Sequence, residues 1–300
     1  MKKFKILTIF LCITMLIFLG SCKKEKKDLC ENGHTWIEAT CEKPKVCSVC
    51  KITDGNPKEH NWVISNNGFL KICEYCKKSE STGKQETFAD LDTAMEVINT
   101  SSFTMTSTQD MSIAIAGEKV NIKMANTTNF DGNNMYMDFL TQITGEDTKV
   151  ATYIKKIDEN YQVYTKTGET WEYIETITAD EYNNEYVNGE TQINATEDMF
   201  TLTNGVWVGD TKKLTAALTD YIQKINESMG GTDSVRNCKI TKYNITLENG
   251  NIKKLELTLS MTITIDSYQA YLDMEMIALY SNIGSTKVKE PSKLPNPTID

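Results

Sequence analysis

The chain has 300 residues, with 32 basic and 41 acidic side chains and a net charge of −9 at pH 7. The charge is unevenly distributed: residues 23–87 carry 12 basic and 10 acidic side chains, whereas residues 88–300 carry 17 basic and 31 acidic, a balance of −14. Nucleic acid and anionic surfaces repel such an acidic region, so we expect no nucleic-acid partner.

The N-terminus has the composition of a secretory signal. Lysines at positions 2, 3 and 5 precede an apolar run at 6–19, which is shorter than the roughly 20 residues of a membrane-spanning helix. The run ends in Leu19-Gly20-Ser21-Cys22, which resembles the lipobox of bacterial lipoproteins. The resemblance implies that residues 1–21 are removed, that Cys22 is lipidated, and that two acyl chains anchor the protein on the extracytoplasmic face of the cell membrane. The alternative is a secreted protein cleaved near Ser21.

Residues 22–29 are rich in lysine and predict a solvated tether. Beyond them, the cysteines and histidines concentrate in one segment. Six of the nine cysteines lie at 30–76, and the only two histidines of the chain lie among them. Six cysteines and two histidines are the ligand complement of two tetrahedral Cys3His sites, so we expect two structural zinc ions. The eight residues are Cys30, His34, Cys41, Cys47, Cys50, His60, Cys73 and Cys76.

The spacing of these residues reveals an internal repeat of 26 residues. In each copy a His-x-Trp motif starts 13 residues before a Cys-x-x-Cys motif, whose first cysteine is Cys47 or Cys73. Cys30 and Cys41 are the two spare thiols, one for each site. Our first assignment gives Cys41 to the site of Cys47 and Cys30 to the site of Cys73, and the exchanged assignment is nearly as good.

A disulfide framework is the alternative to metal, because an extracytoplasmic location permits three disulfides. Disulfides do not explain why both histidines lie at the same distance before a Cys-x-x-Cys motif. In addition, a segment of about 50 residues with few aliphatic side chains buries too little apolar surface to fold alone, and bound metal would supply the missing folding energy. The segment also resembles a repeat of surface proteins and lipoproteins of Gram-positive anaerobes, through Gly33-His34-x-Trp36, Ala39-Thr40-Cys41 and the Cys-x-x-Cys motif. Lys51 replaces the glycine that is usual after that motif. The resemblance implies a spacer or adhesion module at 30–78.

A polar linker at 79–87 separates this module from a long second domain, which we place at 88–291 with a tail at 292–300. Apolar residues at helical spacing predict a helix over 88–100, and a second apolar stripe predicts a helix over 211–229. Alternating apolar residues at 255–265 and 272–280 predict two long antiparallel strands, each with one apolar face. The fold class is therefore α+β: a long antiparallel sheet with a few helices on one face, preceded by a small double zinc-ribbon-like module. The curvature of this sheet follows only from the resemblance described next.

The order of elements resembles the LolA/LppX-like group of lipoprotein and lipid carriers. The shared features are a leading helix, a strand at Phe103, the segment from Tyr161 to Trp171 and the closing segment from Ala278 to Pro291. The resemblance implies a half-barrel whose concave face binds acyl chains. Methionine is common on adaptable apolar binding surfaces, so we take the methionines of the alternating strands as candidate contacts for a hydrophobic ligand. They are Met105, Met111, Met124, Met261, Met274 and Met276.

We expect no enzymatic activity. Both histidines are assigned to metal, which removes the commonest general base from the acidic domain, and Cys238 stands alone there. The sequence therefore predicts a membrane-anchored lipoprotein with a zinc-stabilised stalk and a domain for a hydrophobic ligand. The alternative is a structural or adhesive surface protein with no small-molecule ligand.

Overall fold

The computed structural model describes residues 30, 33–183, 186, 196–229, 234–265 and 268–297. The signal sequence, the lipidation of Cys22 and the tether at 22–29, all of which we expect from the sequence, lie outside these residues. The chain divides into two compact units, one made of residues 1–65 and 70–80 and the other of residues 66–69 and 81–300. None of the helices in the described part is long and apolar enough to cross a membrane.

The first unit contains two small antiparallel sheets of three strands, which we call the first and second ribbons. The strand register repeats with the sequence: Trp36 pairs with Cys47 in the first ribbon, and Trp62 pairs with Cys73 in the second. The third strand of the second ribbon covers Ser79–Ser81, which we had placed in the linker. The strands are β1 (Trp36–Ile37), β2 (Lys45–Cys47), β3 (Thr53–Asp54), β4 (Trp62–Ile64), β5 (Leu70–Cys73) and β6 (Ser79–Ser81).

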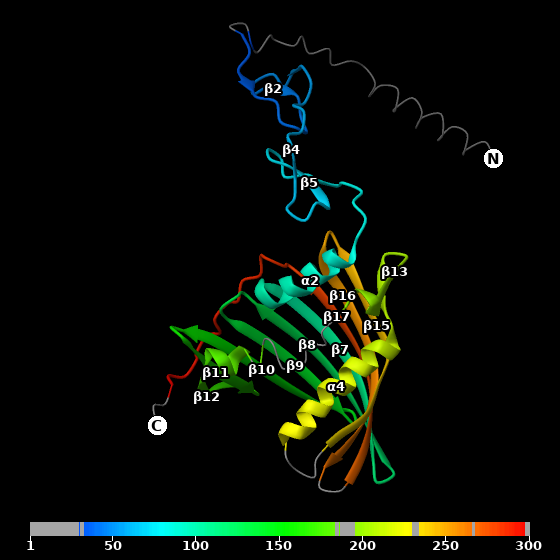
Figure 1. The fold of residues 1–300 in the computed structure, drawn as a ribbon. Coiled ribbons are helices and arrows are strands. Elements are labelled where there is room, and N and C mark those ends of the chain that lie inside the picture. Colours follow the sequence, from blue (N-terminus) through cyan, green and yellow to red (C-terminus); the bar gives the residue numbers. More distant parts are fainter. Residues whose placement is uncertain are drawn as a thin grey trace, which may run out of the picture. The chain divides into compact units, whose positions relative to one another are not determined.

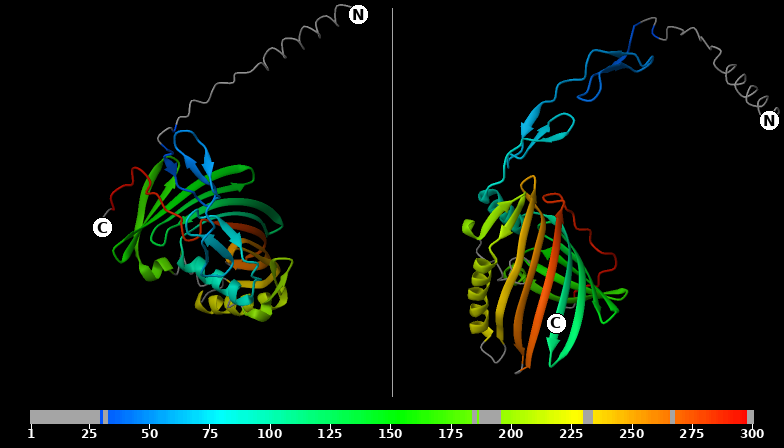
Figure 2. Two further views of the ribbon diagram at one scale, coloured as in Figure 1. Left: turned by 90° about the horizontal axis from the view of Figure 1, so that it is seen from above. Right: turned by 90° about the vertical axis from the view of Figure 1, so that its right-hand side faces the viewer.

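The second unit is built on one antiparallel sheet of eleven strands, in the order β12-β11-β10-β9-β8-β7-β17-β16-β15-β14-β13. The sheet is strongly curved, as predicted, and helices α2 and α4 lie on its concave side (Figure 1 and Figure 2). Strands that follow one another in the chain are paired from β7 to β12 and from β13 to β17, and the last strand, β17, pairs with β7 to join the two halves. The strands are β7 (Phe103–Ile115), β8 (Glu118–Phe130), β9 (Met135–Ile143), β10 (Glu146–Ile157), β11 (Asn160–Thr167), β12 (Thr170–Thr178), β13 (Phe200–Thr203), β14 (Val206–Gly209), β15 (Ser234–Glu248), β16 (Asn251–Ile265) and β17 (Tyr268–Ser281).

The two predicted helices form where the apolar stripes indicated. Helix α2 covers Phe88–Thr100, and the Asp90 carboxylate accepts the backbone N–H of Thr87 at 2.9 Å, which satisfies one of the free donors at the helix start. Helix α4 covers Thr211–Met229, and Asp210 accepts the backbone N–H groups of the second and third helical residues. Two short helical turns, α3 (Ala179–Tyr182) and η2 (Glu197–Met199), follow β12 and precede β13.

The main core lies between α2, α4 and the strands β14 to β16. Leu91 of α2 and Leu214 of α4 pack with Ile245 and Leu259 of the sheet, and all four are buried. Burying such side chains contributes about 1.5–3 kcal/mol each, which is why the helices lie on this face. Leu259 pairs with Met274 on β17, Met274 with Met111 on β7, and Met111 with Ile122 on β8. These four residues therefore lie in one row on the face of the sheet that the helices cover.

Two aromatic clusters complete the core toward the other edge of the sheet. On the concave face, Tyr161 stacks on Tyr182 with ring centroids 3.8 Å apart. On the convex face, Trp171 and Tyr153 are covered by Leu294 of the C-terminal segment. The segment that we had placed in a tail at 292–300 thus contributes to the packing of the domain.

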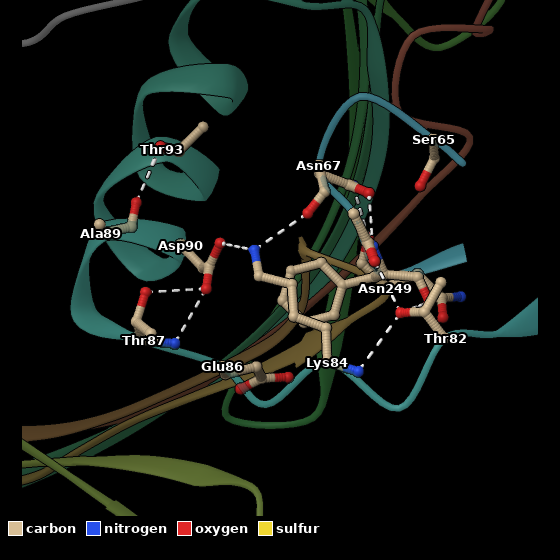
Figure 3. Close-up of polar contacts among 12 residues, drawn as sticks. Ser65, Asn67, Thr82, Lys84, Glu86, Thr87, Ala89, Asp90, Thr93 and Asn249 are labelled. Carbon is tan, nitrogen blue, oxygen red and sulfur yellow. Dashed lines mark hydrogen bonds and ion pairs between the residues drawn. The ribbon is translucent and has the colours of Figure 1, made fainter. Parts of the chain in front are cut away.

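Residues 66–69 cluster with the sheet unit, although they lie in the turn between β4 and β5. The side-chain amide of Asn67 donates to the carbonyl oxygen of Asn249 at 2.8 Å (Figure 3). The Lys84 ammonium donates to the Asn67 carbonyl at 3.0 Å and lies over the Phe69 ring. A Cβ at Gly250 would be 2.8 Å from that ring, so the close approach requires glycine at this position.

Candidate metal centres

The eight predicted ligands assemble into two groups of four. One contains Cys30, His34, Cys47 and Cys50, the other Cys41, His60, Cys73 and Cys76, and the ligand atoms of each group lie within 4.8 Å of one another. Two sites with three cysteines and one histidine each were expected. The structure adopts the exchanged assignment of the two spare thiols: Cys30 completes the first site, and Cys41 completes the second.

The distances within each group fit a tetrahedral ion. Cys30 Sγ and Cys47 Sγ are 3.6 Å apart, as are the Sγ atoms of Cys41 and Cys73. Four ligands about 2.3 Å from a zinc ion stand roughly 3.8 Å apart, whereas disulfide-bonded sulfurs are about 2.05 Å apart. In both sites the histidine Nδ1 is 3.3 Å from the second cysteine of the Cys-x-x-Cys motif. These residues therefore fit a tetrahedral metal ion.

The Cys-x-x-Cys turns position the thiolates by the same backbone geometry in both ribbons. The backbone N–H of Lys51 donates to the Cys47 carbonyl at 3.0 Å, and that of Lys77 to the Cys73 carbonyl at 2.9 Å. Lys51 and Lys77 both have φ of +62°, in the left-handed region. That conformation is the physical reason why glycine is usual at this position in the repeat that the segment resembles.

The turns also set the acidity of the thiols in the folded ribbons before an ion binds. The backbone N–H groups of Cys50 and Val49 hold the pKa of Cys47 down at about 5 despite its burial. Burial acts to raise the pKa of Cys73, but the N–H of Cys76 and the contact with His60 lower it to about 6. These two cysteines are thiolates at neutral pH, ready to bind a cation.

The spare cysteines behave in the opposite way. Burial and the sulfur contact with Cys50 raise the pKa of Cys30 to about 12, and burial and the contact with Cys73 raise that of Cys41 to about 11. Each site thus combines a ready thiolate with a thiol that keeps its proton until a cation displaces it.

Aromatic and basic residues around the histidines repeat as well. His34 packs on Trp36 with ring centroids 5.0 Å apart, and His60 packs on Trp62 at 4.7 Å. The tryptophans thus lie against the imidazole of each site, where they help to fix its orientation. An ammonium covers each indole at 4.8–4.9 Å, from Lys45 in the first ribbon and Lys71 in the second. Sequence reasoning missed these lysines, although their spacing of 26 residues is the period of the repeat.

The six candidate methionines of the sheet share its concave face, since the strand registers bring them into adjacent rows. They divide into two groups. Met261 and Met274 pack against the core under α2 and α4. The other four are half-buried and belong to neither concave-face core cluster among the described residues. These four are Met105, Met111, Met124 and Met276.

A hollow of about 510 Å³ lies over the same central strands. Its polar lining residues, among them Asp110, Lys123, Asp273 and Glu275, alternate in sequence with Met111, Ile122 and Met274 and therefore point to the convex face. The hollow separates two rows of exposed polar side chains. Met111 and Met274, two of the candidate contacts, also line this hollow, but their side chains belong to the opposite, concave face, so we do not identify the hollow with the predicted site.

No protein-family profile and no curated protein sequence match the chain. Among solved structures, the chain is similar to a DUF1329 family protein from Desulfovibrio piger, with 11% sequence identity and a TM-score of 0.23. The match covers 69% of this chain and 96% of that protein.

Proposed function

We propose that the protein is a membrane-anchored extracytoplasmic lipoprotein without enzymatic activity. In this proposal, two structural zinc ions fold the first unit, and the concave face of the sheet binds a lipid or another hydrophobic ligand. The observation that carries the zinc assignment is the pair of Cys3His groups, each with four ligand atoms within 4.8 Å. Zinc is the ion that such sulfur-rich tetrahedral sites prefer.

The ligand count supports a structural rather than a catalytic role for both ions. A catalytic zinc site keeps one coordination position for water or substrate, whereas structural sites use four protein ligands. Each group here offers four. Removal of the ions should therefore unfold the ribbons, whose own apolar core is small.

The concave face supports the binding of a hydrophobic ligand. Met111, Ile113, Ile122 and Met124 on β7 and β8, with Met276 on β17, form a half-buried strip between the two concave-face core clusters of the described residues. We call these five residues the apolar strip. Gln109 interrupts the strip, because it pairs with both Met276 and Met124. Each methylene of an acyl chain that leaves water on this strip would contribute about 0.8 kcal/mol.

The ligand is tested by extraction and mass spectrometry of the chain that starts at residue 23. We expect a stoichiometric hydrophobic molecule, which Ile122→Trp displaces because the larger side chain fills the strip. Asn121→Trp is the matched control, because Asn121 is the neighbouring exposed residue on the opposite face. A folded chain without any extracted ligand, unaffected by added lipid, would contradict this part of the proposal.

The anchor is tested separately by Cys22→Ala in the full chain. We expect this variant to be unlipidated and shed or unprocessed, because Cys22 is the residue that would carry the acyl chains. A variant that is processed and membrane-bound like the wild type would contradict the lipoprotein assignment.

A structural or adhesive role without a ligand is the second candidate, and the surface of the ribbons favours it. Equivalent positions of the two ribbons expose apolar side chains: Ile37 and Val63 on the first strand of each ribbon, and Val49 and Tyr75 in the Cys-x-x-Cys turns. Repeated exposed apolar groups are typical of interaction surfaces. A ligand-free sheet together with loss of surface attachment in Val49→Ser and Tyr75→Ser variants would favour this role.

A further inference from the structure

The two metal sites differ in where their ligands come from. All four ligands of the first site lie in or just before the first ribbon. Three ligands of the second site belong to the second ribbon: His60 lies just before β4, and Cys73 and Cys76 lie at and after the end of β5. The fourth ligand, Cys41, lies between β1 and β2 of the first ribbon. An ion in the second site is therefore bonded to both ribbons at once.

Few other contacts join the ribbons in the described part of the unit. The backbone N–H of Lys58 donates to the Thr40 carbonyl at 2.9 Å, and the Cys41 sulfur is 3.9 Å from the Glu59 carbonyl oxygen. The connecting residues 55–59 are all exposed. A single exposed backbone hydrogen bond stabilises little, because water competes for both of its partners.

The space between the ribbons is open rather than packed. A hollow of about 530 Å³ is lined by Ala39, Thr40, Cys41 and Glu42 from the first ribbon, Lys58 from the connection, and Tyr75 and Cys76 from the second ribbon. Tyr75 is 69% exposed. This junction has no apolar core among its lining residues that could hold the ribbons together, so the bonds to the ion dominate it.

We propose that the second metal ion cross-links the two ribbons, whereas the first ion folds only the first ribbon. With Cys41 bonded to the ion, the ribbons form one rigid unit. Without that bond, each ribbon moves independently about the exposed connection at 55–59. This inference rests on the proposed binding of metal by both sites and adds an unequal role for the two ions.

Two pairs of variants of the full-length chain separate the roles. Cys41→Ser and His60→Ala each disable the second site, and the first of them leaves the second ribbon's own sequence unchanged. Cys30→Ser and His34→Ala are the matched variants of the first site. Metal content is measured for every protein, and hydrogen exchange is measured at the Lys58 amide, whose bond to Thr40 spans the junction.

We expect each variant to keep about one ion where the wild type has two. Exchange at Lys58 should be at least about tenfold faster in both second-site variants. It should stay within about twofold of the wild type in both first-site variants, because Cys41, the neighbour of Thr40, remains bonded to the second ion even when the rest of the first ribbon loses its own ion. Equal exchange in all four variants, with two ions in the wild type, would contradict the cross-link between the ribbons but would not contradict metal binding. A Cys41→Ser chain that keeps two tightly bound ions would also contradict the cross-link. A wild-type chain without metal would overturn both proposals.

Discussion

The sulfur atoms of Cys41 and Cys73 lie 3.6 Å apart, although 32 residues separate them in sequence. The contact joins a loop of one small sheet to the end of a strand in the other. In the folded ribbons, before an ion binds, the two groups differ in protonation at neutral pH, because the pKa of Cys41 is raised to about 11 and that of Cys73 is lowered to about 6. The same asymmetry holds for Cys30 and Cys47 in the first site.

This asymmetry predicts that metal affinity rises with pH. A cation must displace the proton of Cys30 or Cys41, and both groups remain protonated well above neutral pH in the absence of metal. The affinity of each site should therefore increase about tenfold per pH unit for each displaced proton between pH 6.5 and 8. Competition with a chromophoric chelator at several pH values measures it. An affinity that does not change over this range would contradict the protonation assignment.

At Gly209, β14 packs closely against both α4 and β15. A Cβ at this position would lie 2.9 Å from the backbone carbonyl oxygen of Tyr243 and even closer to Leu214 Cδ1. The backbone of β15 has little room to move, so Gly209→Ala should lower the free energy of unfolding by about 1–3 kcal/mol. Val208→Ala, an exposed position on the same strand, is the control and should change it by less than about 1 kcal/mol. Equal stability of both variants in urea unfolding would show that the contact relaxes freely.

Tyr182 carries a buried hydroxyl without a hydrogen-bond partner among the described residues, although its ring stacks on Tyr161 at an angle of 9°. An unpaired buried hydroxyl costs about 1–3 kcal/mol. Tyr182→Phe keeps the stacked ring and removes the hydroxyl, so this variant should be as stable as the wild type or more stable by up to about 2 kcal/mol. Tyr182→Leu, which loses the stack, should be destabilised. A loss of more than about 1 kcal/mol in Tyr182→Phe would reveal a partner for the hydroxyl.

Asp131 joins the turn after β8 to the C-terminal segment. Its carboxylate accepts the backbone N–H groups of Asn133 and Asn134 at 3.1 and 2.8 Å and that of Val288 at 3.2 Å. Partial burial raises the pKa of Asp131, but these donors outweigh it and lower the pKa below its ordinary value. The charged form therefore stabilises the fold above the unfolded pKa of about 3.9, and this stability is lost as pH falls through the lower folded pKa.

Asp131→Asn should lower the free energy of unfolding at pH 7 by about 1–2 kcal/mol, because the neutral amide is a weaker acceptor. The difference from the wild type should shrink as the pH approaches 3. Asp220→Asn, an exposed position on α4, controls for the loss of one charge. Chemical unfolding at several pH values measures both variants, and a penalty that stays constant down to pH 3 would argue against a role for the charge.

The regular elements of the fold could be predicted because their sequence periods are strong. The apolar stripe at 88–100 matches α2, that at 211–229 matches α4, and the alternation at 255–265 lies within β16. Each of these elements buries one face over many residues, so local sequence and tertiary packing favour the same structure.

The pairing of Cys30 and Cys41 could not be predicted from spacing. Both thiols are close enough in sequence to reach either site, and the choice depends on the path of the irregular loop before β2. The loop is fixed by contacts such as that between Thr40 and Lys58, which no sequence period reports. Strand β6 was missed for a related reason: its Ser79, Glu80 and Ser81 have no apolar face.

The C-terminal segment was misjudged because its partners are outward-facing residues of the sheet. Tyr136, Tyr153, Tyr164 and Trp171 form an aromatic cluster on the convex face, which Val288 and Leu294 cover. The alternation at 255–265 and 272–280 predicts only a single apolar face for the sheet. Trp171 and Tyr173, at alternate positions of β12, were the available signal for a second one.

In the proposed function, two ions, each held by three cysteines and one histidine, fold the first unit. Native mass spectrometry and elemental analysis of the chain from residue 23 onward, purified without added metal, test this proposal most directly. We predict two zinc ions per chain, and one ion in Cys47→Ser and in Cys73→Ser, each with its own ribbon unfolded. A wild-type chain with no metal and three disulfides among its six ribbon cysteines would contradict the proposal.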